Sequence, residues 1–178
     1  MHTIQTQRLF LSPLQLNDAA AMYAYASDPE VAQYTSWSPH ESVEASLAFL
    51  NYIIAKENWT PSQFRVVWGI KETRNGPIIG TVSFGQDSPK SGHLDYALSR
   101  TYWGKGYTTE AVERILDWVF EYLPRLEKVC SGCLTKNKGS VRVLEKAGFK
   151  LVDRYSSKRE GKFGGALLET CLFELNRR

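Results

Sequence analysis

The stretch Tyr102-Trp103-Gly104-Lys105-Gly106-Tyr107-Thr108-Thr109-Glu110-Ala111 indicates the fold of this 178-residue chain more directly than any other segment. It joins a predicted strand, residues 92–99, to a predicted helix. Its two glycines let the backbone turn sharply and approach a ligand closely. The start of the helix offers unpaired N–H groups and the positive end of a dipole, which suits a pyrophosphate, and Lys105 adds positive charge. A plain strand-to-helix turn is an equally good interpretation of this stretch alone.

The spacing argues against two well-known phosphate-binding motifs. A P-loop needs lysine and then serine or threonine after its last glycine, and Gly106 is followed by tyrosine instead. A dinucleotide-binding fingerprint needs a third glycine at a fixed spacing, which the stretch lacks.

A second segment strengthens the case for a ligand. It runs from Asn137 to Phe149 and follows the next predicted strand. On a helix, Asn137, Ser140 and Leu144 fall on one face, because they stand three and seven residues apart. That face presents an amide and a hydroxyl to a ligand that leaves the sheet.

The rest of the chain reads as alternating helices and strands. Phe64, Val66, Trp68 and Ile70 alternate as in a half-buried strand, and Asn75-Gly76 predicts a tight hairpin. The predicted strands are residues 9–14, 64–70, 78–84, 92–99, 126–134, 149–157 and 166–175. The predicted helices are about residues 17–27, 38–54, 107–122 and 138–147. A mixed α/β fold follows, with one sheet of about seven strands and about four helices.

Capping patterns give the expected helix ends. Asn17 is the predicted N-cap of the first helix, and Pro29 ends it. Ser38-Pro39-His40-Glu41 predicts the start of the second helix, since it offers a capping serine, a proline and a glutamate. A core-facing stripe of that helix is predicted from its spacing: Val43, Leu47, Leu50 and Ile54. Gly148 is a suitable residue to close the last helix.

Composition indicates one globular domain over residues 1–178, with 43% hydrophobic and 23% charged residues. The net charge of +3 gives no case for a nucleic-acid partner. No apolar run approaches the roughly 20 residues that span a bilayer, and the first residues show no secretory signal. Three cysteines in a chain of this length favour a reducing compartment, so we expect a cytoplasmic protein. The sequence leaves monomer and homodimer open.

The C-x-x-C motif of Cys130 and Cys133 is interpreted as core packing. Residues i and i+3 of a strand point to opposite faces, and no second cysteine pair is present. We expect no metal site.

Together the two segments resemble the GNAT family of N-acetyltransferases. The run from Trp103 to Ala111 is similar to the family's pyrophosphate loop, and Asn137 to Phe149 is similar to its second cofactor motif. Thr6-Gln7-Arg8-Leu9 and Asp28-Pro29-Glu30-Val31 resemble the ribosomal-protein N-acetyltransferase branch. The resemblance implies a GNAT fold with a mostly antiparallel sheet, acetyl-CoA as co-substrate and direct attack by an amine in a ternary complex.

The resemblance also implies a set of cofactor-binding residues: Leu98, Ser99, Arg100, Trp103, Gly104, Lys105, Gly106, Tyr107, Thr108, Thr109, Asn137 and Ser140. The amide of Leu98 is the candidate donor to the thioester carbonyl. Two positions depart from the family pattern. Thr101 stands where the loop often has glutamine or arginine, and Leu144 stands where a tyrosine often protonates the leaving thiolate. Ser140 or water is therefore the candidate acid.

His93 is the candidate general base, because histidine titrates near neutral pH and a glutamate often occupies its position in the family. Asp95 points to the same strand face and is a candidate acceptor-binding residue. A surface histidine and a solvated carboxylate are the competing interpretations. Tyr34 and Trp37 lie where the family builds its acceptor wall, although simple packing explains them equally well. The charged run of residues 158–162 is read as a solvated loop, with contact to an acceptor protein as the less favoured interpretation.

The acceptor amine stays open at this point. It is the N-terminus of a protein, such as a ribosomal protein, or a small molecule such as a polyamine, an amino acid or an antibiotic. A non-catalytic regulator that binds coenzyme A is the alternative outside the enzymes, because the usual tyrosine is missing.

Overall fold

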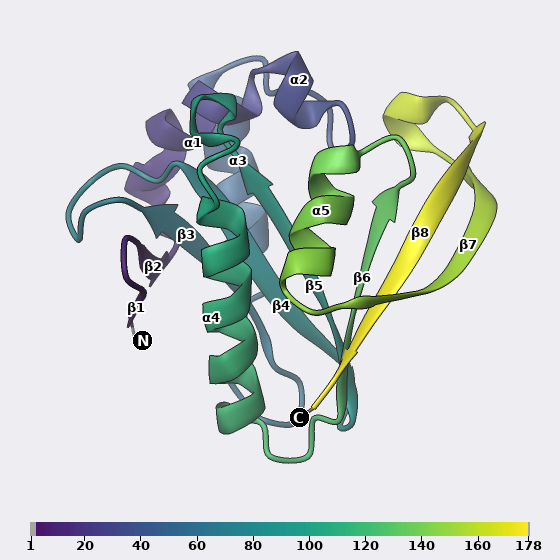
Figure 1. Ribbon diagram of the computed structural model, residues 1–178. Helices are drawn as coiled ribbons and strands as arrows, with labels where there is room; N and C mark the ends of the chain where they lie inside the picture. Colours follow the sequence, from purple (N-terminus) through teal and green to yellow (C-terminus); the bar gives the residue numbers. More distant parts are fainter. Residues whose placement is uncertain (1–2, 178) are drawn as a thin grey trace.

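The computed structural model describes residues 3–177, and within them eight strands form one sheet (Figure 1). The strands are β1 (Ile4–Gln5), β2 (Phe10–Pro13), β3 (Arg65–Lys71), β4 (Gly80–Ser88), β5 (Ser91–Leu98), β6 (Lys128–Leu134), β7 (Lys150–Arg159) and β8 (Ala166–Asn176). Their order across the sheet is β1-β2-β3-β4-β5-β6-β8-β7. Every neighbouring pair is antiparallel except β5 and β6, which run parallel.

Five α-helices flank the sheet in the described part of the chain. They are α1 (Ala19–Ala26), α2 (Pro29–Ala32), α3 (Val43–Ile54), α4 (Tyr107–Tyr122) and α5 (Lys138–Lys146). Helices α4 and α5 lie in front of the sheet in Figure 1, and α1 and α3 lie behind it. The mostly antiparallel α/β fold is thus confirmed. The extra elements are β1, of two residues, and α2, of four, which are too short to produce a periodic pattern.

The hydrophobic core forms two layers, one on each face of the sheet. The alternating residues Val66, Trp68 and Ile70 of β3 are fully buried in the front layer, together with Ala111 and Ile115 of α4. A smaller layer behind the sheet joins α1 and α3 to the sheet. The period of two in β3 and the helical stripe of α4 were therefore read correctly, because each places one apolar face on the larger layer.

Three predicted helix and turn signals were wrong. Ser38–Glu41 does not begin a helix: α3 starts at Val43, where the Ser42 hydroxyl accepts a hydrogen bond from the Ala45 amide (3.2 Å). Asn17 is no N-cap, because Leu16–Asp18 is a 3₁₀ turn and α1 begins at Ala19.

Asn75-Gly76 makes no tight hairpin either, since residues 72–79 separate β3 from β4. The predicted stripe of α3 was half correct. Leu50 is buried, but the side chains of Val43 and Leu47 are each 37% exposed. Pro29 does follow the end of α1, yet it also begins α2, with Asp28 as N-cap.

Candidate functional site

The central strands β5 and β6 separate partway along the sheet. Their parallel pairing covers only Ser91 to His93 of β5, against Lys128 to Cys130 of β6. Beyond His93, β5 remains paired to β4 as far as Leu98, and β6 remains paired to β8 as far as Leu134. A V-shaped gap therefore opens between β5 and β6, with α4 and α5 in front of it (Figure 1).

The amide of Leu98 points into this gap. Ser99 donates its amide hydrogen to Ile79 O across to the β4 side (2.8 Å). Because successive residues of a strand direct their amides to opposite edges, the Leu98 amide faces away from β4. The carbonyl of Leu98 points the same way and accepts a hydrogen bond from Trp103 Nε1 (2.8 Å). Sequence reasoning thus selected an amide that is aimed at the opening between the strands.

The glycine loop after β5 leaves the start of α4 uncapped. Gly104 and Gly106 have φ angles of 76° and 80°, in the left-handed region that glycine tolerates. Gly106 is the N-cap of α4, and no side chain caps the amides of Tyr107, Thr108 and Thr109. By contrast, Ser42 and Asn137 cap α3 and α5 with their side chains. These free amides suit an anion, so the donors here fit a pyrophosphate.

The loop is anchored to the N-terminal segment through Glu110. Its carboxylate accepts hydrogen bonds from the Thr6 hydroxyl (2.5 Å) and the Arg8 amide (2.8 Å). The Arg8 guanidinium pairs with the same carboxylate (2.7 Å) and donates to Lys105 O (2.9 Å). Partial burial raises the pKa of Glu110, but the hydrogen bonds from Thr6 and Arg8 outweigh it and hold the pKa below its ordinary value. Thr6 and Arg8 therefore fix the position of the loop.

Two predicted cofactor residues use their side chains within the protein. Asn137 Oδ1 accepts the Ser140 amide (3.1 Å) and so caps α5. Arg100 Nε pairs with Asp28 Oδ2 (2.8 Å) and links the loop to α2.

A pair of hydroxyls lies in front of the gap. The hydroxyl oxygens of Tyr96 and Ser140 are 2.7 Å apart, and the Tyr96 hydroxyl also lies 3.1 Å from Ser140 O. Burial raises the pKa of Tyr96, against the opposing effect of its bond to Ser140. Burial also raises the pKa of the Cys133 thiol, to about 11, with Ser140 again opposing. Leu144, where the family often has tyrosine, is fully buried in the front core.

His93 and Asp95 face the other side of β5, away from Ser140. His93 Nδ1 lies 2.7 Å from Asp87 Oδ1 at the surface. Asp95 is exposed at the surface. The protein atoms around it raise the pKa of its carboxyl by partial loss of water, while the nearby His93 and Arg65 act in the opposite direction. The candidate acid and the candidate base therefore lie on opposite faces of the sheet, and His93 lies at the closed end of the gap between β5 and β6.

The sequence pattern of the GNAT acetyltransferase domain matches residues 8–150. The chain belongs to the GNAT family of acetyltransferases. It is 29% identical over 182 residues to an uncharacterized N-acetyltransferase, p20, from Bacillus licheniformis, which covers 100% of this chain and 98% of the relative.

Solved GNAT structures share the fold. One is RimL, a ribosomal L7/L12 α-N-protein acetyltransferase in complex with coenzyme A, with a TM-score of 0.82, 15% identity and 98% of both chains covered. Another is the spermidine N-acetyltransferase of Vibrio cholerae in complex with coenzyme A and spermine, with a TM-score of 0.75, 18% identity and 95% of both chains covered. At these identities the likeness concerns the fold alone.

Tyr34 and Trp37 lie in the segment between α2 and α3 of this GNAT chain. Trp37 packs on the layer behind the sheet, with its ring centroid 5.4 Å from that of His40. Lys162, from the loop between β7 and β8, donates to Trp37 O (2.9 Å) and to Ala32 O. Contrary to the interpretation of residues 158–162 as a solvated loop, this lysine joins two loops.

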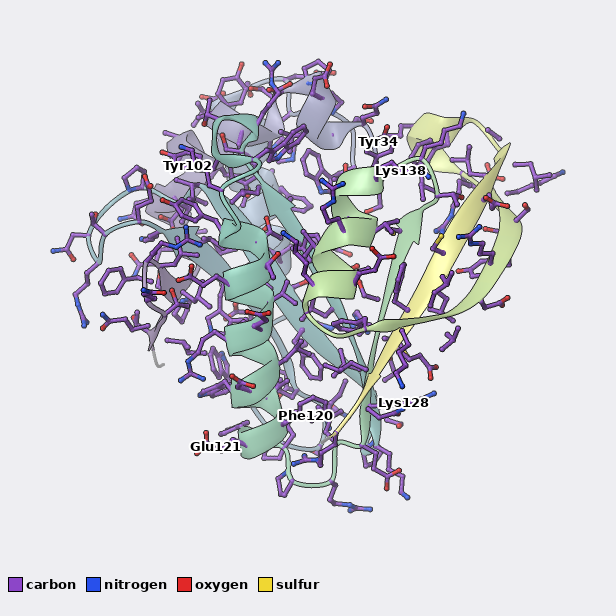
Figure 2. All side chains as sticks on the ribbon, in the orientation of Figure 1. Tyr34, Tyr102, Phe120, Glu121, Lys128 and Lys138 are labelled. Atoms are coloured by element: carbon purple, nitrogen blue, oxygen red, sulfur yellow. The ribbon has the colours of Figure 1, made fainter. Side chains whose placement is uncertain are left out.

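Figure 2 shows which end of the molecule holds the separated strands. Tyr34, Tyr102 and Lys138 lie at one end, and Lys128, where β5 and β6 still pair, lies near the other. Tyr34 is therefore at the open end of the sheet, together with the start of α5 and the glycine loop.

Sequence reasoning missed Tyr96, Arg65 and Asp87. Tyr96 carries a weak signal, since it shares the face of Leu94 and Leu98 at a spacing of two residues. Arg65 and Asp87 carry none, because their neighbours come from other strands.

In the described residues no group of three or more histidine, cysteine, aspartate or glutamate side chains is arranged to hold a metal ion. Across residues 3–177, no helix has the length and apolar character needed to cross a membrane.

Proposed function

We propose that residues 1–178 form one acetyltransferase domain that moves the acetyl group of acetyl-CoA to a primary amine. The observation that carries the proposal is the gap between β5 and β6. It begins beyond the His93–Cys130 pair and is faced by the Leu98 amide, and the strand end that borders it leads into the glycine loop and the uncapped start of α4.

The residues around the gap suit acetyl-CoA. The amides of Gly106 to Thr109 and the Lys105 ammonium would hold the pyrophosphate, with Trp103, Ser99 and the Arg100 backbone beside them. The start of α5, with Asn137 and Ser140, would border the arm of acetyl-CoA that carries the thioester. When bound, acetyl-CoA supplies an activated acetyl group.

Each candidate residue then has a defined role in the transfer. The Leu98 amide would donate to the carbonyl oxygen as negative charge develops there. The amine nitrogen forms the new amide bond, the C–S bond breaks, and the thiolate takes up one proton. The Tyr96–Ser140 hydroxyl pair would supply that proton. Asp95 or His93 would accept the proton that the amine loses.

The observations define the acceptor amine less closely than they define acetyl-CoA as the acetyl donor. RimL and the spermidine acetyltransferase have a similar likeness to this chain and act on different amines. A ribosomal protein N-terminus remains our first candidate, with a polyamine, an amino acid or an antibiotic as the small-molecule alternative. Tyr96 weakens the case for a non-catalytic binder of coenzyme A, since its phenol would serve as the proton donor in the proposed transfer. We expect the enzyme to act in the cytoplasm as a monomer or a homodimer.

Thiol release from acetyl-CoA in the presence of an amine panel tests the proposal. We expect release that depends on both the protein and the amine. Tight binding of coenzyme A with no transfer to any amine would identify a binder and contradict the enzyme.

A further inference from the structure

A polar cavity lies on the rear face of the sheet, outside the proposed acetyl-CoA site. It has a volume of about 310 Å³ and is lined by residues that include Lys56, Asn58, Arg65, Gln86 and Asp87. Lys56 forms no ion pair within the described residues, and its Nζ donates a hydrogen bond to the Tyr52 hydroxyl (2.5 Å). Among residues 3–177, the Arg65 guanidinium has no hydrogen bond or ion pair. The cavity thus holds two cations that form no ion pair within the described residues, beside the carboxylate of Asp87, which pairs with His93.

Gly85 allows Arg65 to reach the candidate base. The three residues Arg65, Gly85 and His93 are cross-strand neighbours on β3, β4 and β5. A Cβ on Gly85 would lie 2.7 Å from His93 Cε1 and 3.6 Å from Arg65 Cζ. Both side chains therefore converge over the bare backbone of Gly85, and Arg65 both lines the cavity and approaches His93.

Asp95 provides the opposite charge next to the gap. It follows His93 by two residues on the same face, or about 7 Å along the strand. Within the described chain its carboxylate has no hydrogen bond or ion pair, whereas Asp87 is paired with His93. The rear face therefore presents a free carboxylate near the gap and free cations farther from it.

We propose that the acceptor carries a carboxylate in addition to its amine, with Asp95 receiving the amine and Arg65 binding the carboxylate. Arginine suits this role because its planar guanidinium can bind both oxygens of a carboxylate. A polyamine would bring a second cation against Arg65 and Lys56, so it is disfavoured. The inference rests on the proposed acetyl transfer and narrows the acceptor to an amino acid or an acidic peptide N-terminus.

Three amines of equal chain length test the inference: 5-aminopentanoate, pentylamine and 1,5-diaminopentane. We expect kcat/KM to be about 10-fold or more higher for the amino acid than for pentylamine, as befits one charge-assisted contact, and lowest for the diamine. Two tripeptide amides that differ only in glutamate or glutamine at the second position distinguish a peptide source from a small molecule. If the ratio of kcat/KM between the glutamate and glutamine peptides exceeds the ratio between 5-aminopentanoate and pentylamine, the acceptor is a peptide.

Variants at Arg65 connect the preference to this cavity. Arg65→Gln should lower kcat/KM for the preferred acidic acceptor about 10-fold more than it lowers kcat/KM for pentylamine, and Arg65→Glu should reverse the order toward the diamine. Arg74→Gln removes the same charge elsewhere on the surface and should change nothing.

If the unmodified protein acetylates pentylamine or the diamine as well as 5-aminopentanoate, or better, the inference is overturned but the proposed transferase function is not. An equal loss for all acceptors in Arg65→Gln would also overturn it, since that indicates a structural role. No transfer to any amine or peptide, with acetyl-CoA binding intact, would instead overturn the proposed transferase function.

Discussion

The Tyr96 and Ser140 hydroxyl oxygens lie 2.7 Å apart although 44 residues separate them in the chain. The contact joins β5 to α5 in front of the gap. In the proposed mechanism it takes the place of the tyrosine that the family often carries on α5, since Leu144 at that position is buried in the core.

Tyr96→Phe should lower kcat about 100-fold or more, since it removes a phenolic donor near the departing thiolate. Ser140→Ala should lower kcat as well. It should barely change the melting temperature, because the α5 start is capped by Asn137 and not by the serine hydroxyl. Steady-state kinetics and coenzyme A titration separate the effects. Loss of stability with unchanged kcat in both variants would show that the pair is structural.

Gly106→Glu should abolish measurable coenzyme A binding. The substitution strains a φ of 80° and adds a carboxylate beside the free amides of α4. Gly161→Glu is a matched control, because Gly161 has a φ of 66° in the distant loop between β7 and β8. Calorimetry should show ordinary affinity in the control. Ordinary affinity in both variants would remove the pyrophosphate from this loop.

The contribution of Tyr25 and Tyr96 to the free energy of unfolding should be nearly constant up to about pH 10 and fall above it. Burial raises the pKa of Tyr25 and of Tyr96, while hydrogen bonds to Thr81 and Ser140 oppose the rise. In alkali the unfolded chain loses these protons near the ordinary value of about 10, but the folded chain keeps them. The unfolded state then binds fewer protons, so stability decreases as pH increases.

Thermal melts of Tyr25→Phe between pH 8 and 11 should therefore show a shallower alkaline decline. Tyr155→Phe, at an exposed tyrosine, serves as the control and should follow the unmodified protein. An identical decline in Tyr25→Phe would mean that other groups cause it.

Exhaustive chelation should leave both the activity and the melting temperature unchanged. Cys130 and Cys133 lie on one strand at a spacing that directs them to opposite faces. Elemental analysis of the purified protein gives the complementary check. A stoichiometric metal that is lost in Cys130→Ser would contradict the assignment of these cysteines to packing.

Periodicity was enough to predict the sheet and the main helices. The alternation of Val66, Trp68 and Ile70 and the stripe of α4 each require only a local pattern and one buried face. Helix starts were less predictable, because Ser38 and Ser42 both precede suitable residues. Tertiary contacts favour Ser42: the His40 amide bonds to Ala26 O and its ring bonds to Ser46, which draws residue 40 out of the helix.

For the site, too, local features were predictable and features that depend on other elements were not. The glycine loop follows from local backbone requirements and the Leu98 amide from the resemblance to the GNAT family, so the sequence indicated both. The neighbours of Ser140, His93 and Asp95 come from other elements and depend on strand register. Arg65 reaches His93 only because Gly85 lies between them on the sheet. No spacing along the chain carries that information.

Amide hydrogen exchange at Leu98, measured by NMR with and without saturating acetyl-CoA, tests the central claim most directly. The Leu98 amide faces the gap, whereas the neighbouring Ser99 amide is already bonded to Ile79 O (2.8 Å). We expect Leu98 to exchange quickly in the free protein and at least about 10-fold more slowly with acetyl-CoA, while Ser99 changes little. Unchanged exchange at Leu98 in the saturated protein would show that the thioester does not occupy the gap between β5 and β6.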